Sequence, residues 1–196
     1  ITISSNGWIN LGETDLECFQ NMPLPGSLSP APLIAAFWDD LYKSSQNISN
    51  ACFYYDQINE LFIVEWSNYV SLYNQSSIES FQVILYNPEY YPTDSRNGRI
   101  KIQYKEIANV NQGTTQNPGC YATVGIQDHT ATQGLLYTYD FQYPDAAKTL
   151  ENEMAILFTT GVNRPASVLN IPSGSTENYQ SLWLDDGNTH VINGTL

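Results

Sequence analysis

An acidic pair is the first candidate for chemistry in this sequence. Asp39 and Asp40 directly follow the apolar run of residues 33–38. Carboxylate oxygens at the end of a strand are ligands that calcium accepts, but successive strand residues point to opposite faces. Both side chains can bind one ion only where the strand has already ended. The pair therefore predicts either a calcium site at Asp39 and Asp40 or a turn in which one carboxylate caps the backbone and the other faces water.

Tyrosine pairs are the second candidate. Tyr54, Tyr55, Tyr90 and Tyr91 supply rings that can stack on a sugar, and the sequence is rich in Asn and Gln that bond hydroxyl groups. Proteins built of strands also use Tyr at half-buried positions without any ligand. These four tyrosines are therefore the candidate ligand-binding residues, and a purely structural role is the alternative.

The sequence offers few residues that could form a catalytic site. Nucleophilic catalysis needs a base beside the nucleophile, and the two histidines, His129 and His190, lie in polar, loop-like surroundings. Glu65 stands between Val64 and Trp66, and strand alternation places it on the opposite face, as a solvent-side group. We therefore predict no catalytic residue, no cofactor other than calcium at the acidic pair, and a protein that is not an enzyme.

Composition narrows the class of partner. Seven Lys and Arg against 20 Asp and Glu give a formal charge of −13, which repels nucleic acid and anionic membrane surfaces. No stretch approaches the roughly 18 apolar residues that a membrane-spanning helix needs, so we expect no membrane insertion. Three cysteines, Cys18, Cys52 and Cys120, allow one disulfide with a spare thiol or three free thiols.

Strand signals dominate the chain. Short runs of β-branched and aromatic residues between Gly, Pro, Asn and Asp turns predict an all-β fold, an antiparallel β-sandwich with long loops and at most one short helix, at 145–153. Asn6-Gly7 predicts a type I′ hairpin turn, and the prolines of residues 21–32 predict a surface loop. Strands are expected over residues 33–38, 52–55, 61–66, 81–86, 99–104, 122–126, 134–139 and 154–158.

The predicted domain boundary lies near residue 162. Residues 1–162 form one β-sandwich module, and residues 163–196 form a linker and tail that is either a docking strand or the start of a following domain. An opening strand at a sheet edge normally pairs with a further strand, so we expect the module to lack its first strand. A tail strand that completes a neighbour's sheet would give self-assembly by strand complementation, into a filament or a surface layer.

Several stretches together resemble nidogen-like extracellular modules and a related β-domain of large secreted bacterial proteins, including gingipain-like proteases. They are residues 4–12, 31–41, 52–55 and 62–66, and the same order continues through 81–86, 98–104 and 122–126. The resemblance covers residues 1 to about 160. Ala36 stands where the family pattern has Pro, and the aromatic-rich strand that usually precedes the pattern is absent.

The resemblance implies a non-catalytic module of a larger secreted or cell-surface protein. Its role would be adhesion or structure, with a protein or a glycan at the cell surface as partner. Residues 13–32, 40–51 and 87–97 would present the binding surface from the rigid sandwich. The alternative is a glycan-binding accessory domain of a secreted protease or glycosidase, which would carry exposed aromatic rings on one sheet face.

Overall fold

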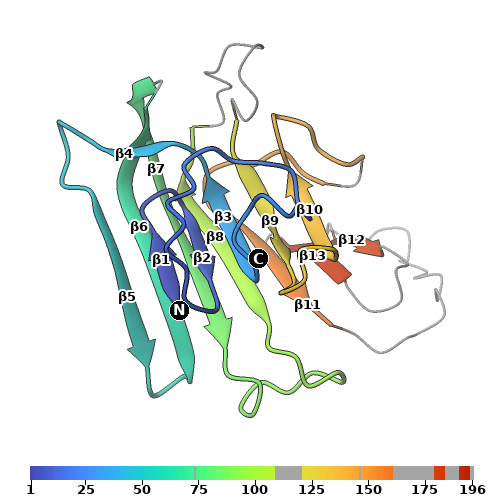
Figure 1. Ribbon diagram of the computed structural model, residues 1–196. Coiled ribbons are helices and arrows are strands. Elements are labelled where there is room, and N and C mark those ends of the chain that lie inside the picture. The colour runs from blue at the N-terminus through green and yellow to red at the C-terminus, as the bar shows by residue number, and fades with distance from the viewer. Residues whose placement is uncertain (73, 109–120, 146, 161–178, 184–189, 195–196) are drawn as a thin grey trace, which may run out of the picture.

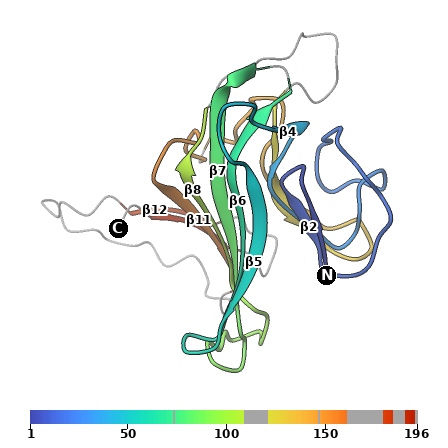
Figure 2. The same cartoon turned by 90° about the vertical axis from the view of Figure 1, so that its left-hand side faces the viewer.

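Two antiparallel sheets form the molecule (Figures 1 and 2). The structure is a computed structural model, and it describes residues 1–196 except 73, 109–120, 146, 161–178, 184–189 and 195–196. The small sheet has the order β1-β2-β3-β9-β10. Its strands are β1 (Thr2–Ser4), β2 (Trp8–Asn10), β3 (Leu33–Trp38), β9 (Thr123–Gln127) and β10 (Gly134–Thr138).

The large sheet runs β12-β13-β11-β8-β7-β6, with β4 and β5 both paired along β6. Its strands are β4 (Leu41–Lys43), β5 (Asn50–Asp56), β6 (Leu61–Ser71), β7 (Asn74–Tyr86), β8 (Ile100–Glu106), β11 (Met154–Thr159), β12 (Tyr179–Trp183) and β13 (His190–Gly194). All described pairs are antiparallel, which confirms the predicted sandwich.

The residues that the structure describes contain no helix. The helical turns expected over residues 145–153 were therefore wrong. The backbone there makes a turn, in which the Ala147 N–H donates to the Pro144 carbonyl oxygen at 2.8 Å. Glu153 ends this stretch with a φ of 61°, in the left-handed region that a right-handed helix cannot use.

The opening hairpin is confirmed, but its turn is not type I′. Ser4 pairs with Trp8, which leaves a three-residue loop of residues 5–7. Only Gly7 in that loop has a positive φ, of 78°, whereas type I′ needs two such residues. A Cβ at Gly7 would lie 2.0 Å from the Phe37 carbonyl oxygen, so this close approach requires glycine.

The core between the sheets is built around aromatic rings. Trp66 of β6 stacks on Phe81 of β7 with ring centroids 5.0 Å apart, and Phe37 of the small sheet meets Phe81 at 5.8 Å. The buried Tyr104 hydroxyl donates to the Ala36 carbonyl oxygen at 2.7 Å, which ties β8 to β3. The alternation predicted for residues 99–104 is confirmed, because Ile102 and Tyr104 are buried in this core.

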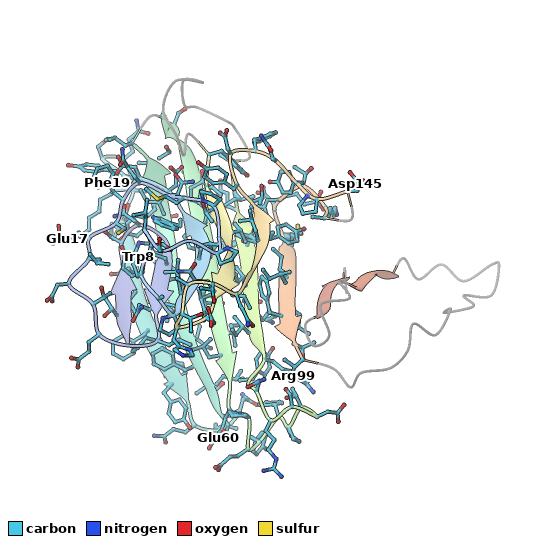
Figure 3. The ribbon with its side chains drawn as sticks, turned by 45° about the vertical axis from the view of Figure 1, so that its right-hand side comes forward. Trp8, Glu17, Phe19, Glu60, Arg99 and Asp145 are labelled. Carbon is cyan, nitrogen blue, oxygen red and sulfur yellow. The ribbon has the colours of Figure 1, made fainter. Side chains whose placement is uncertain are left out.

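The segment 11–32 covers the outer face of the small sheet. The indole N–H groups of Trp8 and Trp38 both donate to the Cys18 carbonyl oxygen, at 2.9 and 3.0 Å. Leu24 packs with these two rings in a second apolar cluster, and Figure 3 shows Glu17 and Phe19 on the same side as Trp8. The predicted proline-rich loop is thus a loop that packs on the sheet, and β3 is buried on both faces as its apolar run indicated.

Candidate functional site

Three of the four candidate tyrosines meet at the end of the sandwich where β5 turns into β6 and β7 enters the loop 87–99 (Figure 1). The Tyr91 hydroxyl donates to the Asn59 carbonyl oxygen at 2.9 Å. The Tyr91 ring meets Tyr86 and Tyr90 edge to face, with centroids 5.0 and 5.2 Å apart. Tyr55 reaches the same turn from β5. We call the group formed by Tyr55, Glu60, Asn87, Tyr90 and Tyr91 the aromatic end.

Glu60 holds the aromatic end together. Its Oε2 accepts hydrogen bonds from the Tyr55 hydroxyl and, at 3.0 Å, from the Asn87 amide, and its backbone carbonyl accepts the Asn87 N–H at 3.1 Å. The bond from Tyr55 first, and that from Asn87 second, lower the pKa of Glu60. Both bonds favour the carboxylate form of Glu60, which Figure 3 shows at the lower end of the molecule.

The aromatic surface continues from this end along β5. The exposed fraction is 67% for Phe53, 64% for Tyr54, 44% for Tyr55 and 60% for Tyr90. Phe53 stacks on Phe62 of β6 with centroids 5.7 Å apart, on the side of the sheet that faces the core. Strand alternation puts Tyr54 on the opposite face. The structure thus brings Tyr55, Tyr90 and Tyr91 together and leaves Tyr54 apart from them.

Sequence reasoning found the tyrosines but missed Glu60 and Asn87. Glu60 closes the β5–β6 turn with a φ of 52°, and Asn87 follows the last residue of β7. Neither residue belongs to a recognisable motif, because a single polar residue at the end of a strand has no characteristic spacing to a second one. The signal that was present is indirect: both residues lie at predicted strand ends, where hairpin pairing brings neighbouring strands to one edge.

The acidic pair lies at the other end of the sandwich, directly after β3 (Figure 1). Asp39 is buried, and its Oδ1 accepts the Asp40 N–H at 2.8 Å, which is the capping arrangement considered above. Burial raises the pKa of Asp39 to about 7; the bond from Asp40 acts in the opposite sense, and the Asp40 charge adds to the rise. The pKa of Asp40 is also raised by burial.

The described residues contain no group of three or more His, Cys, Asp and Glu side chains that could hold a metal ion. The acidic pair alone offers few oxygen ligands, and one of its oxygens already bonds the backbone. Calcium at Asp39 and Asp40 therefore stays a prediction that binding experiments must decide.

The remaining candidates are scattered. Glu65 lies on the outer face of the large sheet, where it accepts a hydrogen bond from Gln82, and Gln82 in turn accepts one from Gln103 at 2.6 Å. His129 is exposed in the turn between β9 and β10. Cys18 and Cys52 are free thiols, while Cys120 and the side chain of His190 lie outside the described residues.

Comparison with known proteins gives one match. A family model described as NIDO related matches residues 1–167. Neither a curated protein nor a solved structure matches the chain. In the described part of the chain, no helix has the length and apolar character needed to cross a membrane.

Proposed function

The chain belongs to the NIDO-related family, whose domains are typically extracellular, and from this membership we propose that it is a non-catalytic interaction module of a secreted or cell-surface protein. The nidogen-like resemblance of the sequence is confirmed by the family match. A place beside a bacterial protease stays a prediction.

The observation that carries the proposal is the aromatic end together with the exposed rings of β5. Tyr and other aromatic residues are enriched where proteins bind one another, because each ring buries a large area with few rotatable bonds. Here Tyr55 and Tyr91 are ordered in advance, since the Tyr55 hydroxyl bonds Glu60 in the β5–β6 turn, and hydrogen bonds from Asn87 and Tyr91 join this turn to the loop 87–99. Binding therefore costs little conformational entropy.

The chemistry of the described carboxylates supports a non-catalytic role. Asp39 caps the backbone of Asp40 at one end of the sandwich, and Glu60 is held ionised at the other. A pair of carboxylates that acts on a glycosidic bond must flank the sugar, with about 5 to 10 Å between them. We therefore assign recognition to the aromatic end, and not bond cleavage.

A glycan-binding accessory role is the second candidate. Tyr90 presents an exposed ring against Tyr91, and its backbone N–H donates to the Asn87 carbonyl oxygen at 3.1 Å; rings next to amides are the chemistry that sugar binding uses. A saturable, sugar-specific signal would favour this candidate over a protein partner.

The test compares Tyr90→Ser with Phe19→Ser, which removes an exposed ring from the segment 11–32 on another part of the molecule. We would measure retention of the labelled chain on surfaces coated with extracellular protein of its source organism, and on a glycan array. Tyr90→Ser should weaken saturable retention at least about tenfold, as loss of an anchoring ring does, while Phe19→Ser should not. Equal retention of both variants, or no saturable retention at all, would overturn the proposal.

A further inference from the structure

The strand β5 forms an open edge of the large sheet. All seven of its residues pair with β6, from Asn50 opposite Ser67 to Asp56 opposite Leu61. In the part of the chain that the structure describes, no strand pairs with the other side of β5. Figure 1 shows this strand at the margin of the molecule, with nothing drawn beyond it. A free row of backbone donors and acceptors therefore faces outward.

Both edges of the small sheet, and the strand β4 beside β5, carry devices that prevent strand pairing, whereas β12, at the other edge of the large sheet, pairs with β13 in unbroken register. Natural edges are kept short, charged or bulged, because an open edge is a template for another strand. At the margin of the small sheet, β1 has three residues, and β10 has a register shift between Leu136 and Thr138. The neighbouring strand β4 has three residues and contains Lys43.

None of these devices is found in β5. It is seven residues long, in unbroken register with β6, and contains no Lys, Pro or Gly. Its only charged residue is Asp56, at the very end. Its three large rings, Phe53, Tyr54 and Tyr55, are exposed by 67%, 64% and 44%. A strand left open in this way is suited to pairing with a second strand.

We propose that two copies of this chain pair through β5, antiparallel and about a twofold axis at Phe53, so that one continuous sheet runs through the dimer. This register uses all seven residues of each strand, and the same patch serves both copies, as a twofold interface requires. Phe53 of one copy faces Phe53 of the other, and Cys52 faces Tyr54. Asp56 faces Asn50, so the single carboxylate of each strand meets an amide and not a second carboxylate.

The area available fits a weak dimer. A fully covered aromatic side chain buries about 150–250 Å², so covering the exposed parts of the three rings in both copies removes on the order of 700 Å² from water. Specific interfaces bury about 1,200–2,000 Å² in total, and the exposed side chains of Tyr42, Ile48 and Ile58 near β5 can contribute to the remainder. Because each copy carries a formal charge of −13, long-range repulsion opposes association.

This inference uses the exposed rings of β5, as the proposed function does, but goes beyond that function because it concerns the backbone edge of β5 and a second copy of the same chain. The proposed function and the β5 dimer can each be disproved without the other. Loss of partner binding in Tyr90→Ser tests the aromatic end, whereas loss of the dimer in a β5 variant tests the edge. Tyr90 lies outside β5, so its substitution should leave the dimer intact.

The first experiment measures the mass of the full chain by analytical ultracentrifugation over a micromolar concentration series at physiological salt. We expect a shift from monomer to dimer. Phe53→Lys places two like charges on the twofold axis and should weaken the dimer at least about tenfold. Leu28→Lys is the matched control at a residue 73% exposed outside β5, and should change nothing. Circular dichroism confirms that both variants fold.

The second experiment tests the register. In a Cys52→Ser background, Phe53→Cys brings two introduced thiols face to face, at the 4.5–5.5 Å Cα separation of directly paired residues, which a disulfide spans. Mild oxidation should give a covalent dimer. Tyr54→Cys in the same background should not, because residue 54 faces residue 52 of the other copy. A chain that stays monomeric, a dimer that Phe53→Lys leaves intact, or cross-linking through residue 54 and not 53 would each overturn the proposal.

Discussion

The strands β3 and β5 have similar length and aromatic content but opposite surroundings. All six residues of β3 are buried, with the large sheet on one face and the segment 11–32 on the other. None of the seven residues of β5 is buried. Aromatic content alone therefore does not decide whether a strand is buried. What decides it is whether a segment distant in sequence folds over it, as residues 11–32 do over β3.

Because of this difference, we expect the two strands to have different roles, β3 in stability and β5 in recognition. Burial of β3 stabilises the fold, since apolar area removed from water is the main favourable contribution. The rings of β5 remain exposed to water in the folded state, so a binding partner can still cover them. We therefore expect substitutions in β3 to change stability, and substitutions in β5 to change recognition.

The largest expected effect comes from truncating one ring in each strand. Phe37→Ala removes a buried side chain that packs against Phe81 and Tyr121, and should lower the free energy of unfolding by about 3–5 kcal/mol. Phe53→Ala should lower it by less than about 1 kcal/mol, because most of that ring is already in water. Urea denaturation of both variants checks the difference, and equal losses would contradict the division between the strands.

The next effect concerns the aspartates that end each strand. Asp39 after β3 has a pKa raised from 3.8 to about 7, mainly by burial, whereas hydrogen bonds, first from the Asn59 side chain, lower the pKa of Asp56 at the end of β5. A raised pKa means that the folded state holds its proton more tightly than the unfolded state. Asp39 should thus make stability fall as pH rises from about 4 to 7, by at most roughly 4 kcal/mol.

Denaturation across that pH range checks this prediction in two variants. Asp39→Asn should remove much of the fall in stability, because the amide does not titrate. Asp56→Asn is the control, and since the pKa of Asp56 is lowered, it should not remove a fall between pH 4 and 7. A pH profile that Asp39→Asn leaves unchanged would show that the burial of this carboxyl costs nothing.

A smaller, kinetic effect distinguishes the two described thiols. Cys52 is exposed on β5, whereas Cys18 is half-buried in the segment over β3, and burial raises its pKa. The thiolate is the reactive form, so Cys52 should react with a disulfide reagent first and Cys18 more slowly. Mass spectrometry of a labelling time course assigns the order, and faster labelling of Cys18 would mean that the segment 11–32 opens readily.

Calcium should have the smallest effect. Asp39 and Asp40 offer few ligands, and one oxygen of Asp39 already accepts a backbone N–H. We expect excess calcium to raise the melting midpoint by less than about 1 °C relative to chelator. A rise of several degrees that disappears in Asp39→Asn with Asp40→Asn would instead establish the metal site that the sequence suggested.

The strands and the core could be predicted from the sequence, because burial leaves a local pattern. The continuous run of β3 and the alternation of Ile102 and Tyr104 both follow from which faces the sheets cover. The packing of residues 11–32 over the small sheet could not be predicted, because it depends on two indole N–H groups that donate to one backbone carbonyl, that of Cys18. A backbone acceptor has no sequence signature.

The aromatic end was predicted in part for the same reason. Its rings are visible as Tyr55, Tyr90 and Tyr91, but the carboxylate that joins them is not. Glu60 contacts Asn87 only because β6 and β7 pair with Leu61 opposite Tyr86, and that register is a property of the folded sheet. The sequence therefore indicates which residues are available for binding, and the pairing of strands decides which of them meet.

Hydrogen exchange of the backbone amides, followed strand by strand at low and high protein concentration, tests the contrast between β3 and β5 most directly. We predict slow exchange in β3 that does not depend on concentration, and faster exchange in β5 that becomes slower as two copies pair. Exchange in β5 that is as slow as in β3 at low concentration would contradict the account, because it would mean that this strand is not an open edge.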